Sequence, residues 1–398
     1  MTVFRPVPAT DRKNCQEILQ YAFTPEKGPV TVSPDGEWPP SLFDQRGLYD
    51  DGVLRAACKL YHLETSVRGQ DTTIGGLGAV ATRPEHRGQG YAANLCRHAL
   101  IEYHESDVGF VALWPFSTPF YQRLGWGTAN TYRRFELPPA VLPRHDVAGQ
   151  LVRLDADDWQ RLRRVEAAAV ADTALSLRRS EAWWRERTLA NWDGGGIPYC
   201  YGYERDGELQ GYIVYTVADD AEHTLSVTNL AYTDEDAHRA LLTFLGNHGA
   251  QIERIVLQLP PDADHLNRVD DPGSVDCTVE SGPMLRLTDV SHLEHLDWPA
   301  GELTCTLSVD DPLLDRNDGL FRLSVSDGTA TVDPVPAADG SDPIDASVDI
   351  ATLSQLAVGT HGIDTAERIA GLDISNGSVR DPLTDVFQPA PVYLGEFF

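Results

Sequence analysis

The 398-residue sequence is poor in lysine and lacks long apolar segments. Only three of its 32 basic residues are lysines, and no apolar run reaches the roughly 20 residues of a membrane-spanning helix. The first residues, MTVFRPVPATDRK, also lack the apolar core of a signal peptide. We therefore expect a cytoplasmic protein with no membrane partner.

Cysteine motifs are also missing. The six cysteines form no C-x-x-C pair, and no cysteine and histidine stand at the spacing of a zinc site. We expect reduced thiols and no bound metal. The cysteines are Cys15, Cys58, Cys96, Cys200, Cys277 and Cys305.

Positive charge is scarce relative to negative charge. Sixty acidic residues stand against 32 basic ones, which gives a net charge of −28. A field of this sign repels nucleic acid and anionic membranes, so neither is an expected partner. Abundant carboxylates with little lysine are typical of a protein kept soluble in concentrated salt. An ordinary acidic protein from a GC-rich bacterial genome is the alternative.

The length of the chain predicts two or three domains, because a single core rarely grows to this size. Apolar periodicity in the first segment predicts the order β-α-β-β-β-α-β, with Asp11 capping the first helix. The expected elements are a strand at 3–7, a helix ending near Phe23, strands at 47–50, 53–63 and 73–82, a helix at 90–104 and a strand at 109–114.

The order partly repeats after residue 150, but without a glycine-rich turn. We interpret residues 149–284 as a degenerate second copy that holds no cofactor. Alternating strands near 303–334, followed by two short helices, predict a third domain with a different order of strands and helices. The final segment, residues 381–398, is aromatic and apolar, whereas ordinary tails are polar and frayed, so we expect it to dock on the protein.

The run RGQGYA, residues 87–92, is the strongest chemical signal. Glycines at a strand-to-helix turn leave backbone N–H groups free to bind an anion, and the helix dipole favours negative charge there. A dinucleotide-binding fold would need a third glycine where Ala93 stands, and a Walker loop would need Lys followed by Ser or Thr. The run therefore favours a pyrophosphate site of another kind.

The longer run from Val80 to Ala92 resembles the acetyl-CoA motif R/Q-x-x-G-x-G/A of the GNAT acetyltransferase superfamily. The block FYQRLGWG, residues 120–127, resembles a signature of the narrower Eis-type (enhanced intracellular survival) acetyltransferases. Those proteins join a catalytic GNAT domain, a degenerate GNAT domain and a sterol-carrier-like domain. The resemblance implies an α+β fold of mixed sheets, with domains at 1–148, 149–284 and 285–398.

By this resemblance, acetyl-CoA is the co-substrate. Main-chain groups of Val80, Ala81 and Thr82 would bind the pantetheine arm, and Phe116 and Ser117 would flank the cofactor. The residues that would cradle the pyrophosphate are Arg87, Gly88, Gln89, Gly90, Tyr91, Ala92 and Ala93. Some relatives carry three successive arginines where this chain has Arg-Gly-Gln, and fewer cations weaken the electrostatic capture of CoA.

The resemblance also implies the acid–base pair. Tyr121 matches the family's catalytic tyrosine, which protonates the leaving CoA thiolate. The carboxylate of the last residue, Phe398, would accept the proton of the amine. Glu396 and Glu26 are alternative bases, and a tyrosine that only packs in the core is the alternative for Tyr121.

The amine acceptor stays open among a small cationic amine, an aminoglycoside-like compound and a lysine side chain. The loop at 24–46, with Trp38 and several carboxylates, is a candidate for lining its pocket. The alternative function is a non-enzymatic carrier of lipid or small molecules that uses the third domain. The resemblance further implies a homo-oligomer, a hexamer in relatives.

Overall fold

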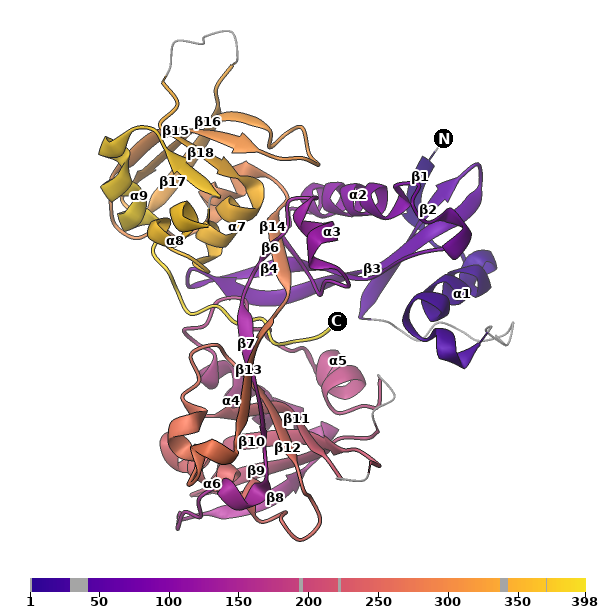
Figure 1. Ribbon diagram of the computed structural model, residues 1–398, viewed down its shortest axis with the longest axis vertical. Helices are drawn as coiled ribbons and strands as arrows, with labels where there is room; N and C mark the ends of the chain where they lie inside the picture. The colour runs from indigo at the N-terminus through magenta and orange to yellow at the C-terminus, as the bar shows by residue number, and fades with distance from the viewer. Residues whose placement is uncertain (1, 29–41, 193–195, 221–222, 337–342, 370) are drawn as a thin grey trace. The chain divides into compact units, whose positions relative to one another are not determined.

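The computed structural model describes residues 2–28, 42–192, 196–220, 223–336, 343–369 and 371–398. The chain divides into two compact units (Figure 1). Unit 1 combines Met1–Ala129 with Pro283–Phe398, and unit 2 is Asn130–Gly282. Within the described residues, no helix is both long enough and apolar enough to span a membrane.

The N-terminal part of unit 1 is a twisted sheet with one helix on each face. Its first seven elements confirm the predicted order. They are β1 (Thr2–Pro6), α1 (Arg12–Phe23), β2 (Phe43–Asp50), β3 (Val53–Val67), β4 (Gln70–Thr82), α2 (Tyr91–Glu105) and β5 (Phe110–Leu113). Strands β1 to β4 form an antiparallel meander, and β4 and β5 are parallel.

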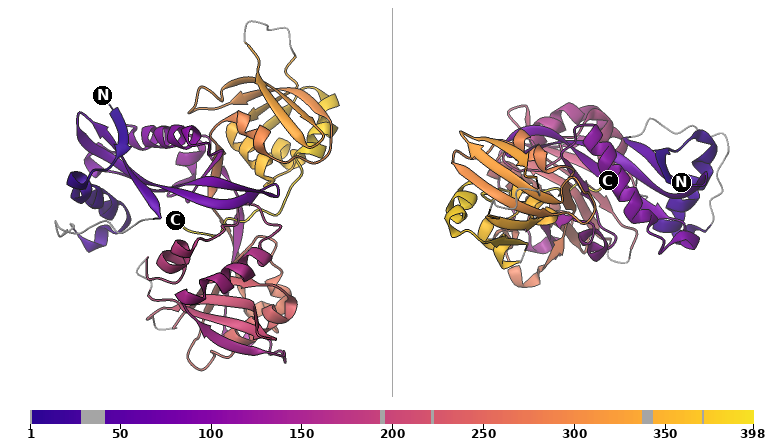
Figure 2. Two further views of the ribbon diagram at one scale, coloured as in Figure 1. Left: turned by 180° about the vertical axis from the view of Figure 1, so that it is seen from behind. Right: turned by 90° about the horizontal axis from the view of Figure 1, so that it is seen from above.

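Alternation along β3 decides which helix covers which face. Ala56, Cys58 and Leu60 pack in the core beneath α2, whereas Ala57 packs with Cys15 of α1. Figure 1 and the left view of Figure 2 show α2 lying along one face of this sheet. The period of two therefore gives each helix its own apolar surface.

The cap predicted for α1 is wrong. Asp11 occupies the N-cap position, but its side chain makes no capping hydrogen bond. Instead its carboxylate accepts a hydrogen bond of 3.0 Å from the Tyr49 hydroxyl on β2. Burial raises the pKa of Tyr49, and the bond to Asp11 raises it further. A tertiary contact has thus replaced the local one that the sequence suggested.

The sheet of unit 1 is completed by a strand from far along the chain. β14 (Met284–Leu287) lies between β5 and β6 (Gly127–Thr128), antiparallel to both. The sheet order is accordingly β1-β2-β3-β4-β5-β14-β6. Neither β14 nor β6 was predicted from the sequence, because such short strands carry no periodic signal of their own.

Unit 2 is a second seven-stranded sheet, ordered β13-β7-β12-β11-β10-β9-β8. Helices α4 (Trp159–Ala169) and α6 (Glu235–Gly246) pack on it, and α5 (Glu181–Trp183) continues into a π-turn. The strands are β7 (Thr131–Leu137), β8 (Gln150–Leu154), β9 (Tyr199–Arg205), β10 (Glu208–Val217), β11 (Leu225–Tyr232), β12 (Ile255–Leu259) and β13 (Asp276–Ser281). Residues 130–148 thus belong to this unit by their contacts.

The C-terminal part of unit 1 has its own five-stranded sheet, ordered β17-β16-β15-β18-β19. Its strands are β15 (Leu303–Asp310), β16 (Gly319–Ser326), β17 (Thr329–Pro334), β18 (Ala346–Asp349) and β19 (Leu372–Ile374), and its helices are α7 (Ile350–Val358), α8 (Ile363–Arg368) and α9 (Arg380–Val386). Helix α7 packs on β14. From α7, Gln355 Nε2 donates to the Thr128 carbonyl at 2.8 Å, and the Ser354 hydroxyl accepts from the Leu287 N–H at 2.8 Å.

A buried arginine, held by an ion pair, joins the two chain segments of unit 1. Arg286 of β14 and Asp311 are both fully buried, and the guanidinium donates to the Asp311 carboxylate and to the Leu124 carbonyl. Asp311 also accepts from the Leu313 and Leu314 N–H groups at 2.8 and 3.1 Å. Burial lowers the pKa of Arg286 and Asp311 opposes that shift, so the guanidinium stays charged.

A second arginine ties the β3–β4 hairpin to α7. Arg68 lies in the hairpin turn, and its guanidinium donates to the carbonyls of Ala357 and Leu356 at 2.6 and 2.7 Å. These carbonyls belong to the last turn of α7, where a cation is favoured by the helix dipole. Burial lowers the pKa of Arg68 to about 10, which leaves the side chain charged at neutral pH.

Replacing Asp311 by alanine should destabilise unit 1 by about 3–5 kcal/mol, because it leaves the Arg286 charge buried without a partner. Urea unfolding followed by tryptophan fluorescence measures the effect, since Trp126 lies 5.1 Å from the guanidinium. Asp310→Ala is the matched control, because Asp310 is the exposed neighbour of Asp311. Equal unfolding midpoints for the two variants would contradict a structural role for the pair.

Candidate functional site

The candidate site begins where β4 and β5 separate. The two parallel strands pair only at Gly75–Val111 and Gly76–Ala112, and β4 then continues to Thr82 without β5 beside it. A bulge helps β4 to diverge, because the register with β3 shifts around Cys58 and Ala79 has a φ of 52°. A non-glycine residue in this region is uncommon, and bulges of this kind bend a strand.

Three predicted cofactor residues lie on this diverging stretch. Val80 and Ala81 are 8% and 4% exposed, and Thr82 is half-buried. The Thr82 hydroxyl is buried and has no hydrogen-bond partner among the described residues. On the side facing away from β3, the main chain of this stretch has no β5 partner, so its N–H and C=O groups are available to an extended ligand.

The glycine loop follows directly and opens α2. Gly88 and Gly90 have φ values of 74° and 81°, and a Cβ built on either one meets no atom within 4 Å. Gly90 is the N-cap of α2, and no side chain caps the helix. The first N–H groups of α2, from Tyr91 to Ala93, therefore point out of the helix without an intrahelical acceptor, as an anion site requires.

Arginines and carboxylates both surround the loop, and several of them are paired. Arg87 lies over the ring of Tyr21 at 5.5 Å, and Arg55 contacts the His86 ring at 2.7 Å. Gln89 donates to the Glu85 carbonyl at 3.3 Å, which fixes the exposed side of the loop. Tyr91 donates its hydroxyl to Asp50 at 2.9 Å, and this bond raises the pKa of the phenol. The tyrosine is thereby held at the base of the loop.

The C-terminal tail docks on the sheet beside this stretch of β4, as the sequence predicted. Phe398 is 7% exposed, and its ring lies 5.6 Å from that of Tyr61. The Glu396 carbonyl accepts a hydrogen bond of 2.7 Å from Trp114 Nε1, just after β5. The tail thus touches β3, β4 and the end of β5.

Glycines of β4 make room for the tail. A Cβ on Gly76 would come within 2.9 Å of the Phe398 ring, and one on Gly78 would lie 3.4 Å from the Phe398 main-chain oxygen. The carboxyl end of the chain therefore lies against Gly78, where β4 has already left β5. Glycines inside a strand often mark such a close approach, so the run G-G-x-G at residues 75–78 is a sequence signal for the docking place of the tail.

Tyr121 lies on α3 (Thr118–Gln122), which follows β5. The side chain is 2% exposed and its ring contacts those of Phe116, Phe120 and Trp126. Burial raises the pKa of Tyr121 above its usual value. The hydroxyl of a phenol can both donate and accept a hydrogen bond, so Tyr121 has the chemistry of a proton donor.

The remaining predicted residues lie on the same segment or outside the site. Phe116 is 63% exposed, and the Ser117 carbonyl accepts from the N–H groups that start α3. Of the alternative bases, Glu26 is exposed, whereas Glu396 is half-buried in the tail. Trp38 of the acceptor loop lies outside the described residues.

Unit 2 repeats the helix between two parallel strands, but the N-terminus of that helix is capped by a side chain. Helix α6 joins the parallel strands β11 and β12, as α2 joins β4 and β5. Its N-cap is Asp234, whose carboxylate accepts from the Ala237 N–H at 2.9 Å. Glu235 and Asp236 add negative charge to the first turn. The Asp234 carboxylate satisfies one N–H group at the helix end, and the negative charge of all three residues disfavours a phosphate there.

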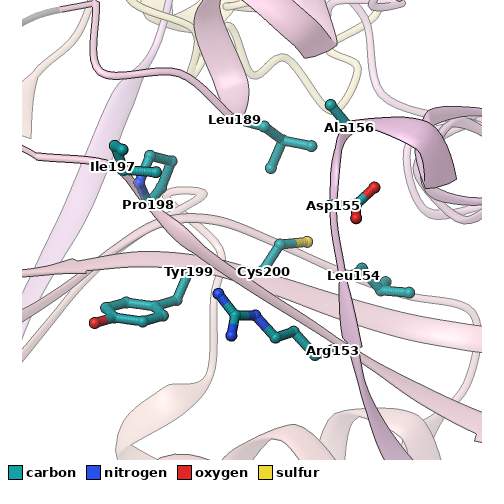
Figure 3. Close-up of a pocket in the computed structure, with 9 residues that line it drawn as sticks. All are labelled: Arg153, Leu154, Asp155, Ala156, Leu189, Ile197, Pro198, Tyr199 and Cys200. Atoms are coloured by element: carbon teal, nitrogen blue, oxygen red, sulfur yellow. The ribbon is translucent and has the colours of Figure 1, made fainter.

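A cavity of about 360 Å³ also lies within unit 2, at the end of β8 (Figure 3). Its walls combine charged and apolar side chains, and Ile197 is 77% exposed at its rim. The lining residues are Arg153, Leu154, Asp155, Ala156, Leu189, Ile197, Pro198, Tyr199 and Cys200. None of them belongs to the parallel strand pair or to α6, so the cavity is not the counterpart of the glycine loop.

Comparison with known families assigns each of the three regions. Acetyltransferase (GNAT) domain families match residues 3–129 and 175–287, and a sterol carrier protein domain family matches residues 290–395. The chain carries two GNAT acetyltransferase domains and a sterol carrier protein domain. The glycine loop belongs to the first GNAT domain, and the predicted fold class is confirmed.

Solved structures share this architecture over the whole chain. A GCN5-related N-acetyltransferase from Anabaena variabilis and a probable N-acyltransferase from Enterococcus faecalis superimpose with TM-scores of 0.84 and 0.86, each at 21% identity. Eis1 from Mycobacterium abscessus superimposes at 0.77 and 21% identity. All three alignments cover 100% of both chains, and they show the fold. No curated protein sequence matches this chain.

Replacing Gly90 by glutamate should weaken acetyl-CoA binding by about tenfold or more, because a carboxylate would stand where the GNAT loop offers N–H groups. Calorimetric titration measures the dissociation constant. Gly207→Glu is the matched control: Gly207 has the same φ of 81°, equally open surroundings and a place in unit 2. If the Gly90→Glu variant bound acetyl-CoA as tightly as the control, the pyrophosphate would not bind at the glycine loop.

Proposed function

We propose that this chain is an N-acetyltransferase that transfers the acetyl group of acetyl-CoA to an amine. The observation that carries the proposal is the uncapped N-terminus of α2 behind Gly88 and Gly90, at the edge where β4 leaves β5. A diphosphate at the helix end and an extended arm along β4 together suit the shape and charge of CoA.

In this proposal each predicted cofactor residue has a distinct task. Backbone N–H groups from Gly88 to Ala93 hold the pyrophosphate, with Arg87 nearby to balance its charge. Main-chain groups of Val80, Ala81 and Thr82 pair with the amides of the pantetheine arm, because β5 leaves them unpaired on that side. Phe116 and Ser117 border the arm from the segment after β5.

We assign the proton donor to Tyr121. When an amine attacks the thioester, the carbon–sulfur bond breaks and the sulfur leaves as a thiolate that takes a proton. The support is the buried position of Tyr121 on the segment that follows β5, with its ring against those of Phe116, Phe120 and Trp126. Since burial raises the pKa of Tyr121, the phenol keeps its proton throughout the neutral and mildly alkaline range.

We assign the proton acceptor to the main-chain carboxylate of Phe398. It lies against Gly78, next to the stretch of β4 that would hold the arm. An α-carboxyl group ionises near pH 3.5, so it is a weak base that needs an amine already close to neutral, or a water relay. Docking through the Phe398 ring and the Glu396 carbonyl fixes its position.

The acceptor in this proposal is a small cationic amine, an aminoglycoside-like compound or a lysine side chain. A net charge of −28 attracts any of these cations to the protein. The Eis-type assignment is part of the same proposal. A homo-oligomer, a cytoplasmic location and adaptation to concentrated salt stay predictions of the sequence.

Tyr121→Phe should lower kcat by about 10²-fold while leaving the affinity for acetyl-CoA unchanged, because it removes only the proton donor. Thiol release from acetyl-CoA measures the rate. The wild-type rate should show no loss from Tyr121 ionisation between about pH 8 and 10, since its raised pKa keeps the acid form present. Tyr212→Phe, a fully buried tyrosine of unit 2, is the control. A kcat within about twofold of wild type would make Tyr121 a packing residue.

Adding a few glycines after Phe398 should lower kcat by about 10²-fold, because the chain keeps its docked ring but its carboxylate moves away. Binding of acetyl-CoA, measured by calorimetry, should persist. The same glycines placed before Met1 control for the extension itself. Full activity of the C-terminally extended protein would exclude the carboxylate as base, and Glu396→Gln would then be the next variant to measure.

A further inference from the structure

A second cluster of ligand-type side chains lies in unit 1 at the junction of the first GNAT domain and the sterol carrier domain. His292 and His295 belong to η9 (Val290–His295), a 3₁₀ helix that leads into the latter domain. Side chains three residues apart eclipse in a 3₁₀ helix, so H-x-x-H aligns both rings. Asp107 reaches them from the turn between α2 and β5.

The spacing of the donor atoms fits a metal ion. The Nδ1 atoms of His292 and His295 lie 3.2 Å apart, and one ligand atom from each of Asp107, His292 and His295 lies within 4.8 Å of the others. Two imidazole nitrogens at about 2.0 Å from a tetrahedral zinc ion stand about 3.3 Å apart. Two histidines and a carboxylate are also a ligand set that zinc accepts.

The backbone holds these side chains in place. A Cβ on Gly109 would come within 2.8 Å of the His292 ring, so the imidazole packs directly on the main chain just before β5. Asp107 has a φ of 59°, a left-handed conformation that costs energy even for aspartate. This conformation follows directly on the end of α2, in the turn that brings the carboxylate to the two rings.

A third imidazole stands beside the cluster. The His104 ring lies 6.1 Å from that of His292, with its Nδ1 atom 3.8 Å from the Asp289 carboxylate. That Nδ1 atom is buried and makes no hydrogen bond within the described chain. Three histidines and two aspartates thus converge at one end of α2, although the sequence as a whole has only 12 histidines.

We propose that Asp107, His292 and His295 bind one divalent transition-metal ion of the zinc class. The ion would cross-link the α2–β5 turn to η9 and so staple the sterol carrier domain to the catalytic domain. Helix α2 has 15 residues and spans about 22 Å, and the cluster lies at the opposite end from the glycine loop. The ion is therefore structural and takes no part in acetyl transfer. The expectation of no metal considered only spacings that include cysteine, and H-x-x-H is the signal that it passed over.

The experiment is a zinc titration of the full chain after removal of metals by a chelator. The exposed Cys277 is first replaced by serine, because a free thiol would take up zinc. Excess Mg²⁺ saturates surface carboxylates without competing for imidazole pairs. We expect calorimetry to show one zinc ion per chain and the Tm to rise by a few degrees at a large excess over Kd.

Two conservative variants and one control identify the ligands. His295→Gln and Asp107→Asn should each weaken zinc binding by about tenfold or more and abolish the rise in Tm, whereas acetyl-CoA affinity stays unchanged. Asparagine tolerates the left-handed backbone at 107, so this variant tests the carboxylate and not the fold. His145→Ala in unit 2 should bind as the parent does. Zinc binding that is absent in the parent, or equal in all three variants, would overturn the proposal and leave a plain hydrogen bond between the two rings.

Discussion

The insertion of β14 into the first sheet is the constraint on which unit 1 depends. Four residues from position 284 onward separate β5 from β6, so the N-terminal sheet cannot close until most of the chain is present. Arg286 turns this insertion into an anchor, because its charge is stable in the interior only with Asp311 beside it. Helix α7 then packs on β14 and binds the edge of β6. Through this strand, and through the contacts of α7 with Arg68 and Thr128, the sterol carrier domain supports the sheet that carries the glycine loop.

The separation of β4 from β5 gives the candidate site its two halves. Where the strands part, the main chain of β4 is left without partners on one side, and this is the edge that an extended cofactor arm would use. The same parting gives the C-terminal tail its place, since Gly76 and Gly78 admit the Phe398 ring and carboxyl group. Arg68 brings the other end of the β3–β4 hairpin to α7 and to the start of the tail segment, with a weak contact of 3.5 Å to Gln388. The tail is thus guided by the hairpin whose strands it contacts.

The two GNAT domains show how little sequence separates an open helix end from a closed one. Both place a helix between parallel strands, but the N-cap of α2 is Gly90, which offers no side chain, and that of α6 is Asp234, whose carboxylate caps the helix. A glycine leaves the N–H groups to a ligand, whereas an aspartate satisfies one of them and adds a negative charge. A capping side chain and a bound anion would use the same N–H groups at the start of the helix. In α6 a side chain uses one of them, whereas in α2 no side chain does.

Local features of this protein were determined by the sequence alone. Apolar periodicity predicted the order of the first seven elements, the glycines predicted the turn before α2, and the apolar composition of the tail predicted its docking. Each of these depends on neighbouring residues or on their burial. Tertiary structure alone decided which strands meet. It placed β14 between β5 and β6, diverted Asp11 from its cap to Tyr49, and set Asp107 beside His292. These pairs lie from 38 to 185 residues apart, and a contact over such a span follows from the packing of whole elements, which no local pattern encodes.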